Sequence, residues 1–501
     1  MTPIAALLDR ITGRVPMYRL LTLVLSVIGV LALALSATGA LFYQPLDLLA
    51  SSAVAIGVSL LATSLLGLVF RVRVHAESSV ITGLLIFFLM VPPTVDTLAL
   101  LDIGLAALLA SLSKFLIVWR GRHLLNPAAA GVFLLSLTGL GAAGWWVATP
   151  ALLPAVAIGA VLVLWRTRSH WVGLTFMVLA TALVSVALIG FGTGPLEALS
   201  TAVGSYPIVF LGAFMLTEPL TLPPRRTQQL IVAAVVAVLF ALPLYVSLSF
   251  GTFYLSQEFA LVVGNLLAAA LVLPAAVTLT FTGARSVGSD AVEYRFCTDR
   301  PLSRARAGQY AELHVPHSGV DRRGSRRHLS LVGEPGAGDV RFAVRTAVPG
   351  SSFKKALAAL NPGDRVRATW VGGDFVLPDD ARRPLVLLAG GIGITPFVSA
   401  LEEGNRDAVL VYRAASAEDV LYRDLLERSA IPVVLVTPEA PAELPKSWRW
   451  AAGLDEALAG MTDLGARAAF VSGTPSFVDR SRRALRSAGV TAIRTDRFSG
   501  Y

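Results

Sequence analysis

Charge and cysteine are both scarce in this chain of 501 residues. Only 15% of the residues are charged and 55% are hydrophobic, and the mean hydropathy is +0.68. Disordered chains combine low hydrophobicity with high net charge, and ordinary soluble domains are about one quarter charged, so the composition excludes both classes. The single cysteine, Cys297, excludes an internal disulfide, a multi-cysteine zinc site and a cysteine-ligated iron–sulfur cluster.

The shortage of charge belongs to the first part of the chain. Residues 1–281 contain 12 Lys and Arg and 8 Asp and Glu, whereas residues 283–501 contain 30 and 25. This increase in the number of charged residues predicts a polytopic membrane domain over residues 1–282, followed by a soluble part. The net charge of +9 divides into +4 and +5, and neither part has the concentrated basic patch of a nucleic-acid binder.

A membrane-spanning helix needs about 20 apolar residues, and the first part of the chain offers ten candidates. They lie near residues 18–40, 48–70, 78–94, 97–118, 124–141, 149–165, 170–191, 203–217, 228–248 and 258–281. Lys and Arg fall in five clusters, one at the start of the first candidate and four between pairs of candidates, and the remaining loops are neutral or acidic. By the positive-inside rule, this pattern predicts a multi-pass protein of a bacterial cytoplasmic membrane with both termini and the soluble part in the cytoplasm. No small-residue cleavage site follows the first apolar run, so we expect a retained helix and not a signal peptide.

Histidine is also scarce where a buried haem would need it. The membrane part contains His75, His123 and His170, and all three fall at predicted cytoplasmic helix ends. A bis-histidine haem requires facing pairs at bilayer depth. The sequence therefore argues against a ferric-reductase-type haem domain, and no metal site is predicted.

Two proline-bearing segments interrupt the apolar pattern at the predicted cytoplasmic face. Arg122–Ala129 opens one helix and Leu216–Pro219 closes another. One interpretation is structural, because proline is well tolerated at a helix start. The other is functional, because interrupted membrane helices line cavities and near-membrane carboxylates mark sites. On that interpretation the site residues are Asn126 and Glu218, with Asp102 as a further candidate carboxylate.

The segments Asn126–Ala129 and Thr217–Pro219 and the ten-helix plan resemble the NqrB/RnfD family of flavin-carrying membrane subunits. In that family an outer-face threonine carries FMN through a phosphoester bond, and the resemblance places it at Thr149. Val147 stands where the family has a glycine. The alternative is that Thr149 is a helix N-cap followed by proline at N1. The resemblance thus implies a candidate membrane flavin or acceptor site of Thr149, Asn126 and Glu218.

Short alternating strands replace the apolar helices after residue 283. They are predicted at Val292–Phe296, Gln309–Val315, His328–Val332, Val340–Ala347 and Arg365–Val371. This pattern predicts an antiparallel β-barrel over residues 283–380. Continuous apolar runs then appear at Leu385–Ala389, Ala408–Tyr412, Val433–Val436 and Ala468–Val471, alternating with helical segments. They predict a parallel α/β domain over residues 381–501.

Three segments of the soluble part have the composition of a nucleotide site. The turn Gly390–Pro396 (with Gly391, Gly393 and Thr395) follows a buried strand, so its backbone can approach a pyrophosphate closely. In Arg327–Ser330, which includes His328 and Leu329, the arginine can pair with a phosphate and the serine hydroxyl can reach a ring edge. The small residues of Gly350–Ser352, with Ser351 between them, leave backbone N–H groups free for a phosphate.

In this order the segments resemble the ferredoxin-NADP reductase-like flavoproteins, together with Ser472–Pro475 and the terminal Phe498–Tyr501. The resemblance implies FAD in the barrel and NAD(P)H on the α/β domain. It makes Ser330, Ser472, Phe498 and Tyr501 the candidate catalytic residues and places Gly473 in the nucleotide site. Leu329 stands where the family has a flavin-stacking tyrosine, and Ser472 where it often has a cysteine. Arg413 follows the second predicted strand of the α/β domain, where a cation near the adenosine ribose would favour NADPH. Because arginine is common at strand ends, the choice between NADH and NADPH stays open.

Together these features predict a membrane-bound oxidoreductase that passes electrons from NAD(P)H through FAD to an acceptor in or across the membrane. The acceptor is a quinone, a membrane flavin or a redox partner protein. Because the hydrocarbon core is about 30 Å thick, transfer across it requires a second redox centre. Two alternatives remain open: a transporter regulated by the flavin domain, and a redox-driven Na⁺ or H⁺ translocator that uses Asp102 and Glu218.

Overall fold

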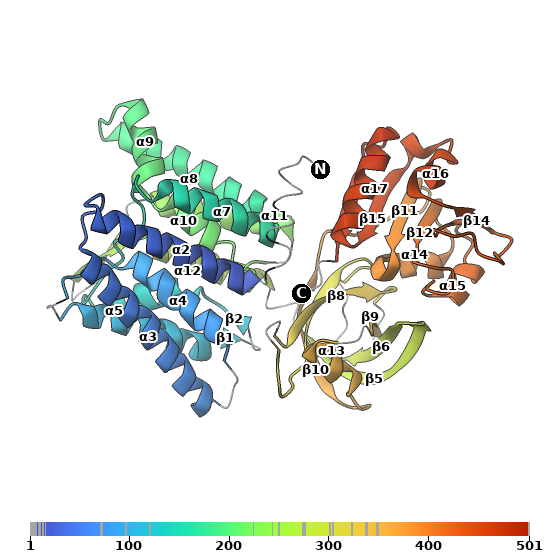
Figure 1. Ribbon diagram of the computed structural model, residues 1–501, viewed down its shortest axis with the longest axis horizontal. Coiled ribbons are helices and arrows are strands. Elements are labelled where there is room, and N and C mark those ends of the chain that lie inside the picture. The colour runs from blue at the N-terminus through green and yellow to red at the C-terminus, as the bar shows by residue number, and fades with distance from the viewer. Residues whose placement is uncertain are drawn as a thin grey trace. The chain divides into compact units, whose positions relative to one another are not determined.

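The computed structural model of the chain divides into two compact units, Met1–Pro274 and Ala275–Tyr501. The structure describes residues 8, 12, 15, 17–70, 74–95, 98–119, 122–223, 225–242, 244–248, 251–272, 277–299, 302, 305–321, 324–335, 339–346 and 350–498. Figure 1 shows the helices of the first unit and the strands and helices of the second.

The N-terminal unit is built mainly of helices. Its longest helices are α2 (Met17–Ala37), α3 (Pro45–Val69) and α8 (His170–Gly190). The shorter ones are α4 (Ala76–Leu89), α5 (Leu100–Leu116), α6 (Pro127–Ser136), α7 (Leu153–Thr167), α11 (Arg226–Ala241) and α12 (Gln257–Val272). Two small hairpins add β1 (Val118–Trp119) with β2 (Arg122–His123), and β3 (Leu244–Leu248) with β4 (Gly251–Leu255).

Within the described residues, three helices are long and apolar enough to cross a membrane: α2, α3 and α8. A fourth span results if α9 (Pro195–Ser205) and the segment Ile208–Met215 are counted together, although they are bent by 50°. That segment consists of α10 (Ile208–Phe210) and a π-helical turn, η1 (Leu211–Met215). The plan of ten spans stays a prediction.

Small residues allow the helices of this unit to approach closely. A Cβ at Gly83 on α4 would lie 2.8 Å from the Ala55 carbonyl oxygen on α3, and a Cβ at Gly131 on α6 would lie 2.7 Å from the Ala110 Cβ on α5. Such contacts are typical of helix packing in a bilayer, where dispersion replaces the hydrophobic effect as the driving force. Large apolar side chains meanwhile face outward along α2, including Val27, which is 64% exposed.

The C-terminal unit begins with a closed antiparallel barrel in the order β10-β5-β6-β9-β8-β7. The strands are β5 (Val277–Gly288), β6 (Ala291–Thr298), β7 (Tyr310–His314), β8 (Arg326–Val332), β9 (Val340–Arg345) and β10 (Arg365–Gly372), and α13 (Ser352–Ala358) follows β9. The predicted helix over 258–281 is wrong at its end, because residues 277–281 belong to β5. Val277, Leu279 and Phe281 alternate into the barrel core, and this two-residue period is hard to recognise inside a continuous apolar run.

A six-stranded parallel sheet follows, in the order β14-β13-β12-β11-β15-β16. Its strands are β11 (Leu385–Gly390), β12 (Ala408–Arg413), β13 (Val433–Val436), β14 (Trp448–Ala451), β15 (Ala468–Gly473) and β16 (Ile493–Arg497). The connections contain η3 (Gly391–Phe397), α14 (Val398–Glu403), α15 (Arg423–Arg428), α16 (Leu454–Ala459), η4 (Leu464–Ala466) and α17 (Pro475–Ser487). The strand order reverses between β11 and β15, and ligands of open α/β sheets bind at the carboxyl ends of strands at such a point.

Polar contacts join the barrel to the sheet. Arg341 on β9 forms two hydrogen bonds to Glu402 on α14, of 2.7 and 2.9 Å. The Tyr422 hydroxyl, at the start of α15, donates to the fully buried Glu293 of β6 at 3.1 Å. These contacts position the carboxyl edge of the sheet against the barrel.

Candidate functional site

The glycine-rich turn after β11 lies directly against the end of β15. A Cβ at Gly393 would collide with the Ser472 carbonyl oxygen and lie 2.8 Å from the Gly473 Cα. Gly391 has φ +55°, in the left-handed region that favours glycine. Both features require glycine and keep the backbone of the turn open to a close-lying ligand such as a pyrophosphate.

Two further contacts fix the residues around this turn. Thr395 is buried and its hydroxyl donates to the Ile392 carbonyl at 3.1 Å, with Pro396 next to it in η3. The Phe498 backbone N–H donates to the Gly473 carbonyl at 2.8 Å, which fixes Phe498 at the same edge. The Ser472 side chain is fully buried there, and its hydroxyl has no hydrogen-bond partner within the described residues. Tyr501, the other predicted aromatic, lies outside the described residues.

Arg327 on β8 is anchored toward the start of α13. Its guanidinium donates to the Gly324 carbonyl at 3.0 Å, lies 3.8 Å from the Asp321 carboxylate and is centred 5.2 Å above the Phe353 ring. The Asp321 carboxylate accepts from the Ser352 backbone N–H at 2.8 Å. The structure therefore brings together Arg327 and Ser352, which the sequence analysis assigned to one site.

The remaining candidates of this segment differ in their surroundings. Ser351 caps α13 by accepting from the Lys354 N–H at 3.4 Å, directly after Gly350. His328 is exposed and lies 3.9 Å from Glu312. Leu329 packs against the barrel core. Ser330 faces outward from that core next to Leu329, at the end of β8 that contacts η3.

Arg345, at the end of β9, is a site residue that the sequence analysis missed. One of its terminal nitrogens lies 2.8 Å from the position of a Cβ on Gly391, and the other pairs with Asp290 at 3.3 Å. A cation is thus placed directly beside the turn. The feature of the sequence that could have identified Arg345 is its position as a basic residue at the end of the predicted strand before the Gly350 segment.

Asp496 on β16 lies next to Ser472 in the strand register, at the edge that carries the site. Burial raises the pKa of its carboxyl to about 7, whereas an unfolded chain has a pKa of about 3.9. Stability that depends on the protonated form is therefore fully present below about pH 4 and is lost as the pH rises through about 7. We expect Asp496→Asn to be more stable than the wild type at pH 8, and by more than at pH 5. Thermal unfolding at both pH values measures this; an equal difference at both would contradict it.

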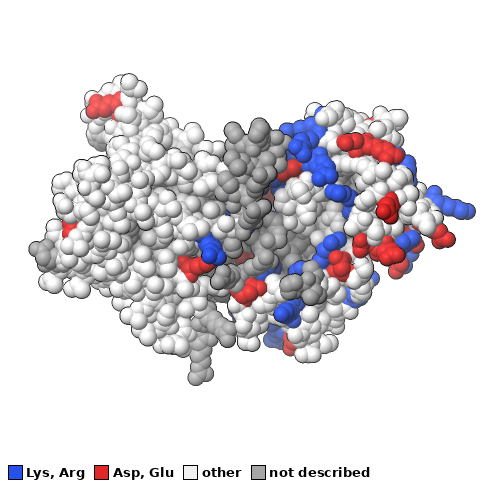
Figure 2. Space-filling model, in the orientation of Figure 1, with Lys and Arg blue, Asp and Glu red and all other residues white. Residues whose placement is uncertain are grey.

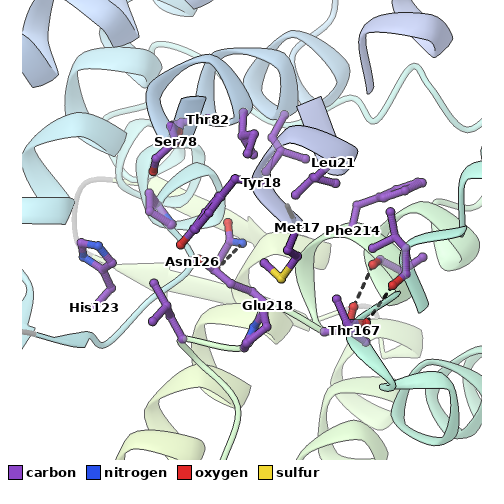
Figure 3. Close-up of a pocket in the computed structure, with 18 of the residues that line it drawn as sticks. Met17, Tyr18, Leu21, Ser78, Thr82, His123, Asn126, Thr167, Phe214 and Glu218 are labelled. Carbon is purple, nitrogen blue, oxygen red and sulfur yellow. Dashed lines mark hydrogen bonds between the residues drawn. The ribbon is translucent and has the colours of Figure 1, made fainter. Parts of the chain in front are cut away.

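The N-terminal unit contains a separate polar pocket, formed where α6 begins and η1 ends (Figure 3). Asn126 is the N-cap of α6, with Pro127 at N1, and its side-chain oxygen accepts from the Ala129 N–H at 3.2 Å. Its amide group donates to the Glu218 carboxylate at 3.0 Å. The two residues come from segments 92 positions apart, and the sequence analysis had assigned both to a cavity.

Lys114 on α5 lines the same pocket, and sequence analysis did not single it out. The side chain is 8% exposed and donates to the Ser78 carbonyl at 3.1 Å and to the Ser78 hydroxyl at 3.4 Å. Tyr18, His123 and several threonines also line the pocket. An ammonium group, a carboxylate and an amide therefore face one cavity beside a π-helical turn, an irregularity found frequently at functional sites.

Thr149 is not among the residues that line this pocket. The expected N-cap is not observed: α7 begins at Leu153, and it is the Thr149 carbonyl that accepts from the Leu152 and Leu153 N–H groups, at 3.1 and 3.0 Å. The Thr149 hydroxyl is buried and has no hydrogen-bond partner within the described residues. The preceding Trp145 has φ +48°, a strained conformation for a bulky residue.

The chain is similar to several curated proteins, although no protein-family model matches it. It is 27% identical over 199 residues to NADH oxidoreductase HCR of Escherichia coli strain K12, which covers 38% of this chain and 59% of that protein. It is 35% identical over 126 residues to the reductase component of propane 2-monooxygenase from Mycolicibacterium goodii, covering 24% and 34%. It is 37% identical over 130 residues to the electron transfer component of toluate 1,2-dioxygenase from Pseudomonas putida, covering 25% and 36%.

The chain thus spans about one third to three fifths of the length of these relatives. Among solved structures, it aligns with the Amycolatopsis cytochrome P450 reductase GcoB at 25% identity, covering 44% of this chain and 69% of that one with a TM-score of 0.37. These three relatives are an NADH oxidoreductase, a reductase component and an electron transfer component, which is the class of protein that the sequence predicts.

Proposed function

We propose that this chain is a membrane-bound oxidoreductase that takes electrons from NAD(P)H through FAD and delivers them to an acceptor in the membrane. The observation that carries the proposal is the arrangement at the carboxyl edge of the sheet. There the turn of Gly391 and Gly393 lies against β15 and contacts β8, the strand of Arg327. Open α/β sheets bind nucleotides at this kind of strand end, and the neighbouring barrel strand offers an arginine for a phosphate.

The residues present fit a flavin and a nicotinamide nucleotide. The buried guanidinium of Arg327 and the hydroxyl groups at the start of α13 would hold the FAD phosphates, and Gly390–Pro396 would hold the NAD(P)H pyrophosphate. The buried Ser472 hydroxyl and the backbone-anchored Phe498 would bound the space for the nicotinamide ring. A bound flavin supplies the conversion of a two-electron donor to one-electron transfers, and the protein positions the two rings.

The acceptor site that we propose is the pocket of Asn126, Glu218 and Lys114 in the N-terminal unit. The outward-facing apolar side chains of its helices support a location in a bilayer, and the positive-inside pattern supports a cytoplasmic C-terminal unit. Paired polar groups inside a membrane protein are functional-site candidates by default. The proposed acceptor is a quinone or a membrane flavin, and the names of the curated relatives also support a separate redox partner.

Flavin stoichiometry tests the proposed function. The purified full chain is expected to release one FAD on denaturation. A second flavin that stays with the denatured chain and disappears in Thr149→Ala would support covalent attachment at Thr149 and a path across the bilayer. Release of FAD alone leaves the quinone or a partner protein as acceptor, and a preparation that binds no flavin would overturn the proposal.

Glu218→Gln is expected to lower NADH-dependent reduction of a membrane quinone at least about tenfold, because the variant removes the charge opposite Lys114 in the pocket. Reduction of ferricyanide, a soluble acceptor, is expected to stay within about twofold. Glu197→Gln, in the first turn of α9 and outside the pocket, is the matched control. Equal losses with both acceptors would place the effect in the C-terminal unit and contradict the assignment.

Arg345→Gln is expected to raise the KM for NAD(P)H about tenfold with kcat within about twofold. The guanidinium beside Gly391 would contact the nucleotide phosphates equally in the ground state and in the transition state. Its loss therefore weakens binding of the nucleotide, which raises KM, and leaves the barrier of the bound complex, which sets kcat, almost unchanged. Steady-state kinetics with ferricyanide measures both constants. Arg428→Gln, on an exposed position of α15, is the control, and a loss confined to kcat would contradict the role.

A further inference from the structure

Helix α17 is amphipathic, and its exposed face is made of arginines. The buried residues are Phe477, Val478, Ser481 and Leu485. The other side of the helix has Arg480, Arg482, Arg483 and Arg486, of which Arg482 is partly exposed and the other three are exposed. Arg480, Arg483 and Arg486 follow one another at intervals of three residues, which places them along one side of the helix, and Arg482 lies at the edge of this row. Figure 2 shows the corresponding cluster of positive side chains over α17. We call these four residues the arginine stripe.

Among the residues that the structure describes, no acidic side chain forms an ion pair with the arginine stripe. The acidic residue within α17, Asp479, forms an ion pair with Arg497 of β16 instead. Within the described residues, no ion pair involves Arg480, Arg483 or Arg486. Four neighbouring guanidinium groups repel one another, and an anionic surface would relieve this repulsion.

The short connection to the N-terminal unit indicates which anionic surface lies within reach. Helix α12 ends at Val272 and β5 begins at Val277, so four residues, with a reach of roughly 14 Å, join the helical unit to the barrel. If the N-terminal unit spans the bilayer, as proposed above, the C-terminal unit is held close to the cytoplasmic leaflet. The surface of that leaflet is negative, and it attracts juxtamembrane Lys and Arg residues.

We propose that the arginine stripe of α17 binds the anionic phospholipid headgroups of the cytoplasmic leaflet. This inference rests on the proposed membrane location. Guanidinium groups match phosphate oxygens in a bidentate geometry, which favours arginine over lysine at such a surface.

The test uses the full chain in lipid nanodiscs, with a fluorescent donor on Ser487→Cys at the exposed end of α17 in a Cys297→Ser background. The acceptor dye is attached to lipid headgroups. We expect high energy transfer in discs that contain about one third phosphatidylglycerol, and low transfer in phosphatidylcholine discs or at 1 M salt. The triple variant R480Q/R483Q/R486Q is expected to lower the ratio of docked to undocked molecules about a hundredfold.

The matched control is R382Q/R383Q/R428Q, which removes three exposed arginines from other surfaces of the same unit and is expected to leave the transfer unchanged. Equal transfer in both kinds of disc, or no change in the stripe variant, would overturn the proposal while leaving the proposed function intact. The proposal would also be overturned if the arginine stripe bound an acidic soluble protein but not the lipid headgroups. Failure of the chain to enter nanodiscs at all would instead overturn the membrane location itself.

Discussion

Replacing Gly393 by alanine is expected to lower the rate of flavin reduction by NAD(P)H at least about a hundredfold without loss of bound FAD. The added Cβ would collide with the Ser472 carbonyl oxygen and the Gly473 backbone. Neither is a flexible side chain, so the turn itself must move away from β15. A displacement of about 1 Å is enough to cost about two orders of magnitude when the reacting rings must be held in contact.

Stopped-flow absorbance at the flavin band measures this rate, and the flavin-to-protein ratio reports FAD binding. Gly453→Ala is the matched control, because a Cβ at Gly453 meets nothing within 4 Å and its φ of −151° is open to any residue. A Gly393→Ala protein that is reduced as fast as the control would show that the turn does not position the nucleotide. Loss of FAD together with the rate would indicate a purely structural role.

Replacing Glu293 by glutamine is expected to destabilise the C-terminal unit by about 2–4 kcal/mol, because it removes the charge at the centre of a buried hydrogen-bond network. The fully buried carboxylate accepts from Arg285 at 2.7 and 3.2 Å, from Arg295 at 3.2 Å and from the Tyr422 hydroxyl at 3.1 Å. For a unit of this size, the change corresponds to a Tm lower by roughly 5–10 °C. Glu403→Gln, which breaks a partly exposed pair with Arg406, is the control with an expected cost below about 1 kcal/mol.

The effect of Glu293→Gln is expected to depend on pH. Burial alone would raise the pKa of the Glu293 carboxyl, but the hydrogen bonds and charge of Arg285 outweigh it and hold the pKa below its usual value. The unfolded value is about 4.3, so the contribution of the carboxylate is present above that pH and disappears as the pH falls through the lower, folded value. The Tm difference from the wild type should therefore shrink below about pH 4. A difference that grows in acid would contradict this account.

The sequence predicted the strands of the barrel and sheet that alternate or run apolar between glycine and proline breaks. It missed β5, since Val277–Gly288 follows an apolar helix without an intervening polar segment. The closed barrel needs this strand, which pairs with both β6 and β10. Helix α11 likewise ends at Ala241, before the β3–β4 hairpin, although the apolar run continues to residue 248. Local hydrophobicity cannot separate a helix from a buried strand over such short runs.

The residues of the candidate sites also divide into those that a local sequence pattern identifies and those that it does not. Gly390–Pro396 and Arg327–Ser330 were recognisable because phosphate binding requires particular residue types at fixed spacing, and Asn126 and Glu218 because proline marks where apolar helices break. Lys114, Arg345 and Glu293 have no such local signal.

The sequence by itself determined the two-part organisation, the reductase-like order of motifs in the second part and the scarcity of metal-ligating residues, because composition and spacing are properties of the chain. Only the tertiary structure decided which groups meet. It placed Gly393 against Ser472 across two parallel strands, Asn126 beside Glu218 across 92 residues, and Arg345 beside Gly391. These contacts follow from strand order and helix packing, which bring distant residues together through burial of apolar surface that no single segment encodes.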